Sequence, residues 1–178
     1  VWTWGAGDAL GLGSVTQSRT PMPVPGISTA VAIAAGSNHV LAVLANGTVR
    51  SWGVNSSGQL GNNAVANSAV PVAVAGLSGV VRVAAGDDFS LALRSDGSVW
   101  AWGGGAHGEL GVGSSAPSSC AGRDVYNSAS TSIPCARVPV QVFGVSNITA
   151  ISSRGRHSLA LRSDGSVWAW GSGRYGQI

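Results

Sequence analysis

Lysine is absent from the 178-residue sequence, and charged residues of either sign make up only 10% of the chain. The ten basic residues are all arginines, and the formal net charge is +3. Nucleic-acid binding usually needs Lys and Arg clustered on one face. The one local group of basic residues comprises Arg154, Arg156, Arg162 and Arg174. Such a group either binds phosphate or consists of solvated loop and strand-edge arginines. The low charge favours the second reading and argues against nucleic acid as a partner.

Long hydrophobic runs are also missing. No apolar stretch approaches the ~20 residues that a membrane-spanning helix needs, so the sequence predicts no membrane span. No window keeps a 3.6-residue period, which argues against helices. With 27 glycines, the composition is that of a β-rich, turn-rich protein and not of a disordered one.

The strongest feature that the sequence does contain is a repeat. Full copies lie at 31–53, 81–103 and 149–171, and a partial copy opens the chain at 1–5. The repeats run about 1–26, 27–75, 76–143 and 144–178, and an insertion near 112–136 lengthens the third. A period of about 50 residues is typical of β-propellers, because β-helix repeats are far shorter.

Each copy predicts short strands joined by tight turns. In the middle copy the strands are expected at 81–85, 90–94 and 99–102, with a hairpin at Asp96-Gly97. Asp-Gly between two β-rich runs predicts a type I′ turn, which needs positive φ at both central residues. A weaker fourth strand is expected near the Pro-Val segments, since proline suits an edge strand. The fold class is therefore all-β: a propeller of four-stranded blades, here a partial arc of about three and a half repeats.

Tryptophans recur in register. Trp4, Trp52, Trp102 and Trp170 precede the repeated glycine. Because they recur at one place in every copy, we predict that they are buried wedges between adjacent blades.

Cys120 and Cys135 both lie in the insertion. Two cysteines that close one Ser/Ala-rich loop predict a disulfide; the alternative is a pair of free thiols in a cytosolic loop. We expect the disulfide and a protruding loop. Disulfides form in oxidising compartments, so the pair predicts an extracellular or cell-envelope location.

The repeat resembles the regulator of chromosome condensation family. Its hallmark is a strand ending in Ala-Ala-Gly, then His-Ser-Leu-Ala-Leu, Asp-Gly, a Trp-Gly strand and Gly-Gln-Leu-Gly. Matching lines lie at 34–61, 84–111 and 152–178, and in part at 1–26. The resemblance implies a seven-bladed propeller, of which this chain is a part, that binds proteins through its rims and faces. Members include a nucleotide-exchange factor for a nuclear GTPase, a plant UV-B photoreceptor and secreted bacterial inhibitors of β-lactamase. The lack of lysine, the cysteine pair and the Ala/Ser/Gly-rich style are closest to secreted bacterial members.

The histidines and aspartates of the sequence do not form a recognisable catalytic arrangement. His39 and His157 share one repeat position, where the middle copy has Phe89, so a structural role is expected. Asp96 and Asp164 are turn residues without a second acid at a fixed distance, as acid–base work would need. We expect no enzyme activity, no metal site and no cofactor.

Charge varies between copies at one loop position, where Asp87-Asp88 take the place of Ser37-Asn38 and Gly155-Arg156. A position whose charge differs between otherwise similar repeats is typical of a recognition surface. Random sequence variation in a loop explains the difference as well. The possible binding rim comprises Asp87, Asp88, Arg154, Arg156, His107 and Arg174.

These observations predict a non-catalytic propeller outside the cytoplasm that binds a protein partner. Three alternatives stay open: a structural surface protein that assembles with copies of itself, a propeller lyase or hydrolase, and a regulator resembling guanine-nucleotide exchange factors. Small apolar first strands argue against an enzyme site at the ring centre.

Overall fold

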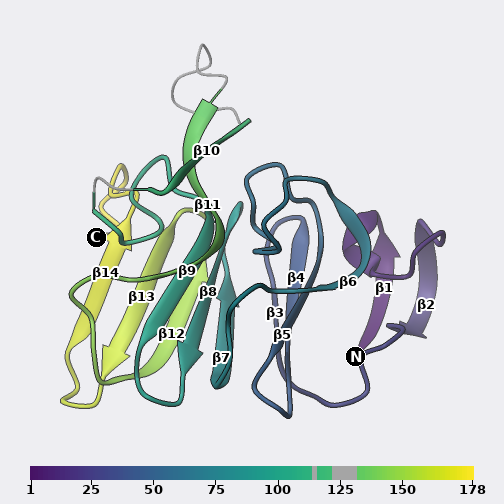
Figure 1. Cartoon of the computed structure of the whole chain (residues 1–178), viewed down its shortest axis with the longest axis horizontal. Helices are drawn as coiled ribbons and strands as arrows, with labels where there is room; N and C mark the ends of the chain where they lie inside the picture. Colours follow the sequence, from purple (N-terminus) through teal and green to yellow (C-terminus); the bar gives the residue numbers. More distant parts are fainter. Residues whose placement is uncertain (114–115, 122–131) are drawn as a thin grey trace.

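The computed structural model of the chain describes residues 1–113, 116–121 and 132–178. Their secondary structure is all-β apart from one short 3-10 helix, η1 (Asp8–Leu10). The strands form four antiparallel sheets, which we call blades 1 to 4 in chain order (Figure 1). Among the described residues, no helix is long and apolar enough to cross a membrane.

Blade 2 shows the complete unit, a four-stranded sheet in the order β3-β4-β5-β6. Its strands are β3 (Ala30–Ala35), β4 (His39–Leu44), β5 (Val49–Gly53) and β6 (Ser68–Ala73). β4 and β5 are almost wholly buried, because blades cover both of their faces. β6 contains the expected Pro-Val segment and lies at the outer edge, where a strand tolerates proline.

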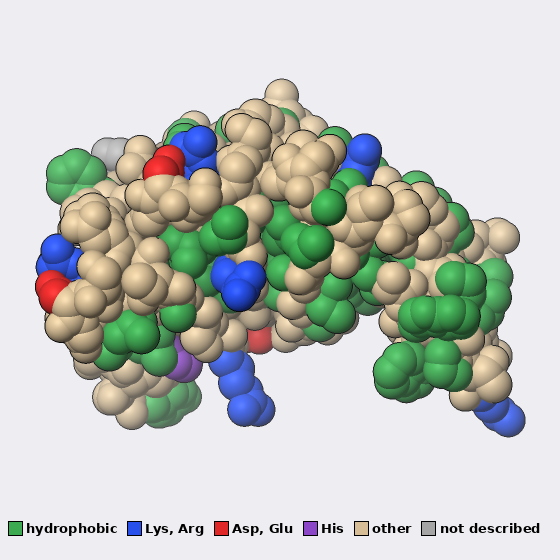
Figure 2. Space-filling model, turned by 90° about the horizontal axis from the view of Figure 1, so that it is seen from below, with side chains coloured by type: hydrophobic (Ala, Val, Ile, Leu, Met, Phe, Trp, Pro, Cys, Tyr) green, Lys and Arg blue, Asp and Glu red, His purple; other side chains and the backbone are tan. Residues whose placement is uncertain are grey.

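The other blades are variations on this unit. Blade 1 has two strands, β1 (Trp2–Ala6) and β2 (Gln17–Pro23). Blade 3 has β7 (Val80–Ala85), β8 (Phe89–Arg94), β9 (Val99–Gly104), β10 (Ser118–Ala121) and β11 (Ser132–Gln141). Blade 4 has β12 (Ile148–Arg154), β13 (His157–Arg162) and β14 (Val167–Gly171). The first strands of blades 2 to 4 contact one another at the inner edge, where their small side chains allow close approach. Figure 2 shows the resulting curved body, with hydrophobic side chains gathered over blade 1.

The hairpin turns lie where the sequence predicts them, but the type I′ assignment is wrong. Of the turn residues, only the glycines have positive φ, with 76° at Gly47 and 79° at Gly97. In blade 2, Gly47 N donates to Leu44 O over 2.8 Å, and Asn46 Oδ1 accepts a hydrogen bond from Thr48 N. This is a type I turn followed by a left-handed glycine. The side-chain bond to the residue two positions on keeps Asn46 out of the left-handed region.

The repeated tryptophans join neighbouring blades, as predicted for two of the four. Trp52 and Trp102 are buried, and their indole N–H groups donate to Ala9 O and Gln59 O of the preceding blade. Trp170 makes the equivalent bond to Glu109 O but is only half-buried. The prediction is wrong for Trp4, which is 64% exposed because no described blade precedes it.

In the described part of the insertion in blade 3, two strands pair where a loop was expected. β10 pairs with β11, and β11 continues into the blade to pair with β9. The predicted disulfide joins Cys120 to Cys135 across this hairpin, with a Cα–Cα distance of 5.8 Å. The rest of the predicted insertion, 114–115 and 122–131, lies outside the described residues. In Figure 1 the hairpin rises above the blades.

Two faces follow from this arrangement. The upper face carries the turns between first and second strands, the connections after the third strands, and the β10–β11 hairpin (Figure 1). The lower face carries the hairpin turns 45–47, 95–97 and 163–165.

Candidate functional site on the upper face

The turns between first and second strands form a chain of contacts across blades 2 to 4. Ser37 Oγ donates to Asp87 Oδ1 over 2.7 Å, and Asp87 N donates to Gly155 O over 2.8 Å. These residues occupy one position of the repeat, so the repeat itself brings them together. Asp87 therefore contacts both neighbouring blades and helps to hold blades 2, 3 and 4 together.

Arg156 comes from the same turn of blade 4 and reaches across to blade 3. Its Nη2 lies 3.8 Å from Asp88 Oδ2, and its Nε lies 4.0 Å from Asp87 Oδ2. Both contacts are long, and the two aspartate side chains are 41% and 44% exposed. Ion pairs of this kind contribute little to stability, because water screens them. The two carboxylates consequently remain available at the surface.

Glu109 adds a third carboxylate, which the sequence analysis missed. It lies in the connection after β9 and is only 4% exposed, and its Oε2 accepts a hydrogen bond from His107 N over 2.7 Å. Gln59 and Gln177 make the same bond in blades 2 and 4, to Ser57 N and Tyr175 N. The sequence did contain a signal for this residue, because Glu109 occupies the position where the repeats of blades 2 and 4 have glutamine.

Burial dominates the electrostatics of the site. It raises the pKa of Asp88, an effect opposed by Arg156 and reinforced by Asp87. Burial also raises the pKa of Glu109, although backbone N–H groups, His107 and Arg156 act in the other direction. Removing a carboxylate from water disfavours its charged form, so Arg156 only partly compensates these two acids.

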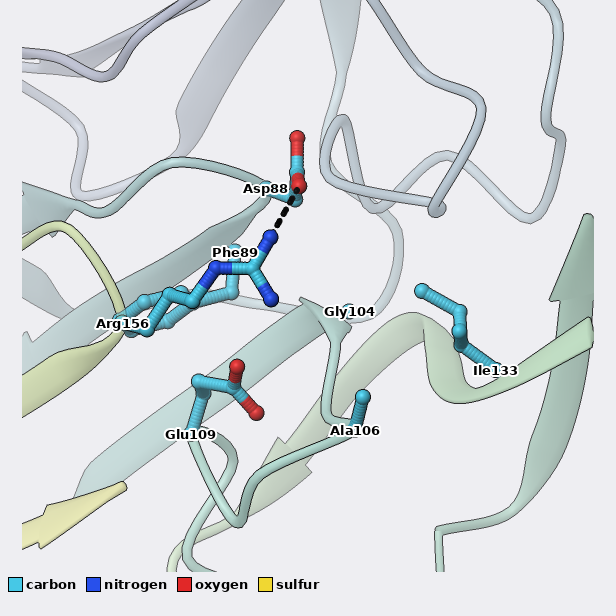
Figure 3. A pocket seen from close by; sticks show the side chains of 7 residues that line it. All are labelled: Asp88, Phe89, Gly104, Ala106, Glu109, Ile133 and Arg156. Atoms are coloured by element: carbon cyan, nitrogen blue, oxygen red, sulfur yellow. Dashed lines mark ion pairs between the residues drawn. The ribbon is translucent and has the colours of Figure 1, made fainter. Parts of the chain in front are cut away.

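A small pocket lies between these groups. Its cavity of about 20 Å³ has room for roughly one water molecule. Figure 3 shows the Arg156 guanidinium between Asp88 and Glu109, with Phe89 behind and Ile133 of the hairpin at the side. The arrangement presents charge at its mouth and is too small to enclose a substrate.

The structure brings most of the predicted rim residues to this part of the upper face. Asp87, Asp88 and Arg156 form the cluster, and His107 donates its backbone N–H to Glu109. Arg154 and Asp87 line an open depression of about 540 Å³ at the inner edge. Arg174 is not among the residues that line these pockets. It lies after β14, with its guanidinium 5.9 Å from the centre of the Tyr175 ring.

His39 is built into the junction between blades 2 and 3. It is fully buried, its Nε2 lies 2.9 Å from Ser90 Oγ, and Ser90 Oγ in turn donates to Gln59 O. Since the serine hydrogen is used in that bond, His39 is the donor to Ser90 and is neutral. Burial lowers its pKa to about 4. These contacts give His39 a structural role.

Comparison with known proteins agrees with this architecture. Models of the regulator of chromosome condensation (RCC1) repeat match residues 1–43, 46–93 and 96–161. Over 63 residues, 33% of this chain, the sequence is 41% identical to the ultraviolet-B receptor UVR8 of Arabidopsis thaliana and 40% identical to the protein RCC2 homolog of Danio rerio. These matches cover only 14% and 13% of the two relatives.

Solved structures extend the likeness to nearly the whole chain. Yeast RCC1 (Prp20), in its complex with Kap60, superposes with a TM-score of 0.79 at 27% identity, covering 97% of this chain and 39% of that one. Human WBSCR16 superposes with a TM-score of 0.71 at 24% identity, over 92% of this chain and 40% of that one. This chain thus spans well under half of the propellers that it matches. The repeated strands, the tryptophans between blades and the family-model match together show that the chain belongs to the regulator of chromosome condensation (RCC1) repeat family.

Proposed function

We propose that the chain is part of a non-catalytic propeller, outside the cytoplasm or in the cell envelope, that binds a protein partner through its upper face. One observation carries the proposal: the features that distinguish one blade from another gather on that face. They are the charged turn at Asp87-Asp88, Arg156 of the next blade, and the disulfide-closed hairpin. The central strands and the tryptophans between blades 2, 3 and 4 follow one repeated pattern.

The relatives support a binding role in general terms. Yeast RCC1 was solved bound to another protein, Kap60. Asp87 and His39 are engaged in contacts between blades, which leaves them poorly placed for acid–base catalysis. The ionisable groups of the upper face therefore favour a binding role over an enzymatic one. The disulfide supports the proposed location, since cytosolic thiols are kept reduced.

Masking each face in turn tests the binding role. Ser56 is exposed in a connection of the upper face and Ser95 in a hairpin of the lower face. Each is changed to cysteine, labelled with a maleimide-linked polyethylene glycol without reductant, and offered to culture fluid and envelope extract of the source organism. The wild-type protein and the Ser95→Cys conjugate should retain the same binding protein, and the Ser56→Cys conjugate should lose it.

Retention by the upper-face conjugate, or loss only with the lower-face label, would overturn the proposed surface. Location is tested separately, by cell fractionation and immunodetection of the native protein. Recovery in the cytosolic fraction with free cysteines would refute the proposed compartment.

A further inference from the structure

Compared with blade 2, blade 3 has two acids in place of amides. Asp88 stands where blade 2 has Asn38, and Glu109 stands where blades 2 and 4 have Gln59 and Gln177. Each change keeps the shape of the side chain and adds a negative charge. The fold brings both to the pocket at the junction of blades 3 and 4 (Figure 3).

The charges at this junction do not balance. Among the described residues, the carboxylates of Asp87, Asp88 and Glu109 lie around the guanidinium of Arg156, and His107 also acts on Glu109. The contacts of Arg156 with Asp88 and Asp87 are 3.8 and 4.0 Å long, at the limit for an ion pair. Arg154 lies at the inner edge with its side chain exposed and adds one further positive charge. A second cation placed at the mouth of the pocket would therefore be attracted.

An apolar pocket adjoins the acidic one. It has a volume of about 230 Å³, and its larger side chains are Leu110, Val112, Ala116 and Pro134, with four glycines and Ala106 completing the lining. Ala106 lines both pockets, and the consecutive hairpin residues Ile133 and Pro134 line one each. A space of this size accepts a branched aliphatic side chain. Successive side chains of an extended segment point to opposite sides, so the two side chains that enter adjoining pockets must be two residues apart, a spacing of about 6.6 Å.

We propose that the upper face of blade 3 binds an extended protein segment in which a basic residue lies two positions from an aliphatic one. The basic group lies at the exposed carboxylate of Asp88, at the mouth of the acidic pocket, where buried Glu109 adds negative charge. The aliphatic group fills the pocket that Pro134 lines. This inference rests on the proposed protein-binding function and names the chemistry of the partner. The disulfide Cys120–Cys135 keeps the hairpin, and with it Ile133 and Pro134, in position.

The test uses a random peptide library displayed on phage and selected against the intact, oxidised chain. The variant Asp88→Asn/Glu109→Gln removes both charges and introduces the residues that blade 2 has at these positions, Asn38 and Gln59, so its fold should be retained; melting temperature and circular dichroism check this. The matched control is Asp96→Asn/Asp164→Asn on the lower face. It removes the same charge, and Asn46 occupies that position in blade 2.

Selected peptides should contain a basic residue two positions from Leu, Ile or Val. Synthetic copies of the selected peptides should bind at least tenfold more weakly to the Asp88→Asn/Glu109→Gln variant, with at most a twofold change for the control. Their binding should weaken as salt rises, because screening shortens the range of the attraction. Basic peptides that bind the double amide variant as well as wild type would overturn the inference, as would selection without enrichment of basic residues.

The outcomes separate the inference from the broader proposal. Selected peptides without basic residues that are blocked by the Ser56→Cys label would refute the inference and leave an upper-face binding function standing. If the label does not affect peptide binding, or if no peptide is recovered, the result would count against both the inference and the proposed binding function.

Discussion

Replacing His39 by phenylalanine should remove most of the acid sensitivity of the junction between blades 2 and 3. Phenylalanine is the residue that blade 3 has at the equivalent position, Phe89, where it is buried in the same manner. At pH 8 the variant loses the hydrogen bond to Ser90, worth about 1 kcal/mol, and gains apolar burial. Ser90 keeps its bond to Gln59 O. The free energy of unfolding at pH 8 should therefore change by no more than about 1 kcal/mol.

The difference in stability between wild type and the His39→Phe variant should appear at acidic pH. Burial holds the pKa of folded His39 at about 4, below its ordinary value of 6.5. Between these pH values the unfolded chain binds a proton that the folded chain does not. Stability from His39 is therefore fully present above pH 6.5 and is lost as pH falls towards 4. The loss amounts to about 2 kcal/mol at pH 5 and about 3 kcal/mol at pH 4.

Urea unfolding, followed by tryptophan fluorescence at pH 8, 6 and 5, measures this effect. The stability advantage of wild type over His39→Phe should fall by about 2 kcal/mol from pH 8 to pH 5. Other titrating groups are common to both proteins and cancel in the difference. Parallel pH profiles for the two proteins would show that His39 is not neutral and buried, and would refute the reasoning.

Three further predictions concern the blade contacts and the insertion. Trp102→Ala should lower the free energy of unfolding by about 3–5 kcal/mol, since the ring is fully buried and its N–H donates to Gln59 O; a loss under 1 kcal/mol in urea unfolding would contradict the wedge. A thiol assay on unreduced protein should find no free cysteine, and Cys120→Ser/Cys135→Ser should destabilise by up to ~3 kcal/mol; two reactive thiols would contradict the disulfide. Glu109→Gln should be neutral or stabilising at pH 8 and lose that advantage in acid. A raised carboxyl pKa means that the folded state binds a proton more tightly than the unfolded chain, so stability declines as pH rises through that range. A variant less stable than wild type at pH 8 would contradict this.

Local sequence rules predicted the blade well because most of its structure depends on short-range chemistry. The hairpin turns and the Pro-Val edge strand require particular residues within a few positions of one another, and the two cysteines are only 15 residues apart. The repeat then multiplied each signal, so the same strand order is recovered in blades 2 and 3. The turn type was mistaken for a reason of detail: the side-chain bond of Asn46 to Thr48 decides the conformation, and the dipeptide alone does not show it.

Contacts between blades were decided by the tertiary structure. Trp4 and Trp102 have the same sequence context, but one is exposed and the other buried, because burial depends on whether a neighbouring blade covers the ring. From the sequence alone, Glu109 is a substitution at the position of a structural glutamine. The fold shows that it lies beside Asp88 and Arg156. The sequence by itself determined the repeating blade, since strands and turns follow from local residue patterns. Only the tertiary structure decided which charges meet on the upper face, because they come from separate repeats and are joined by packing between the sheets.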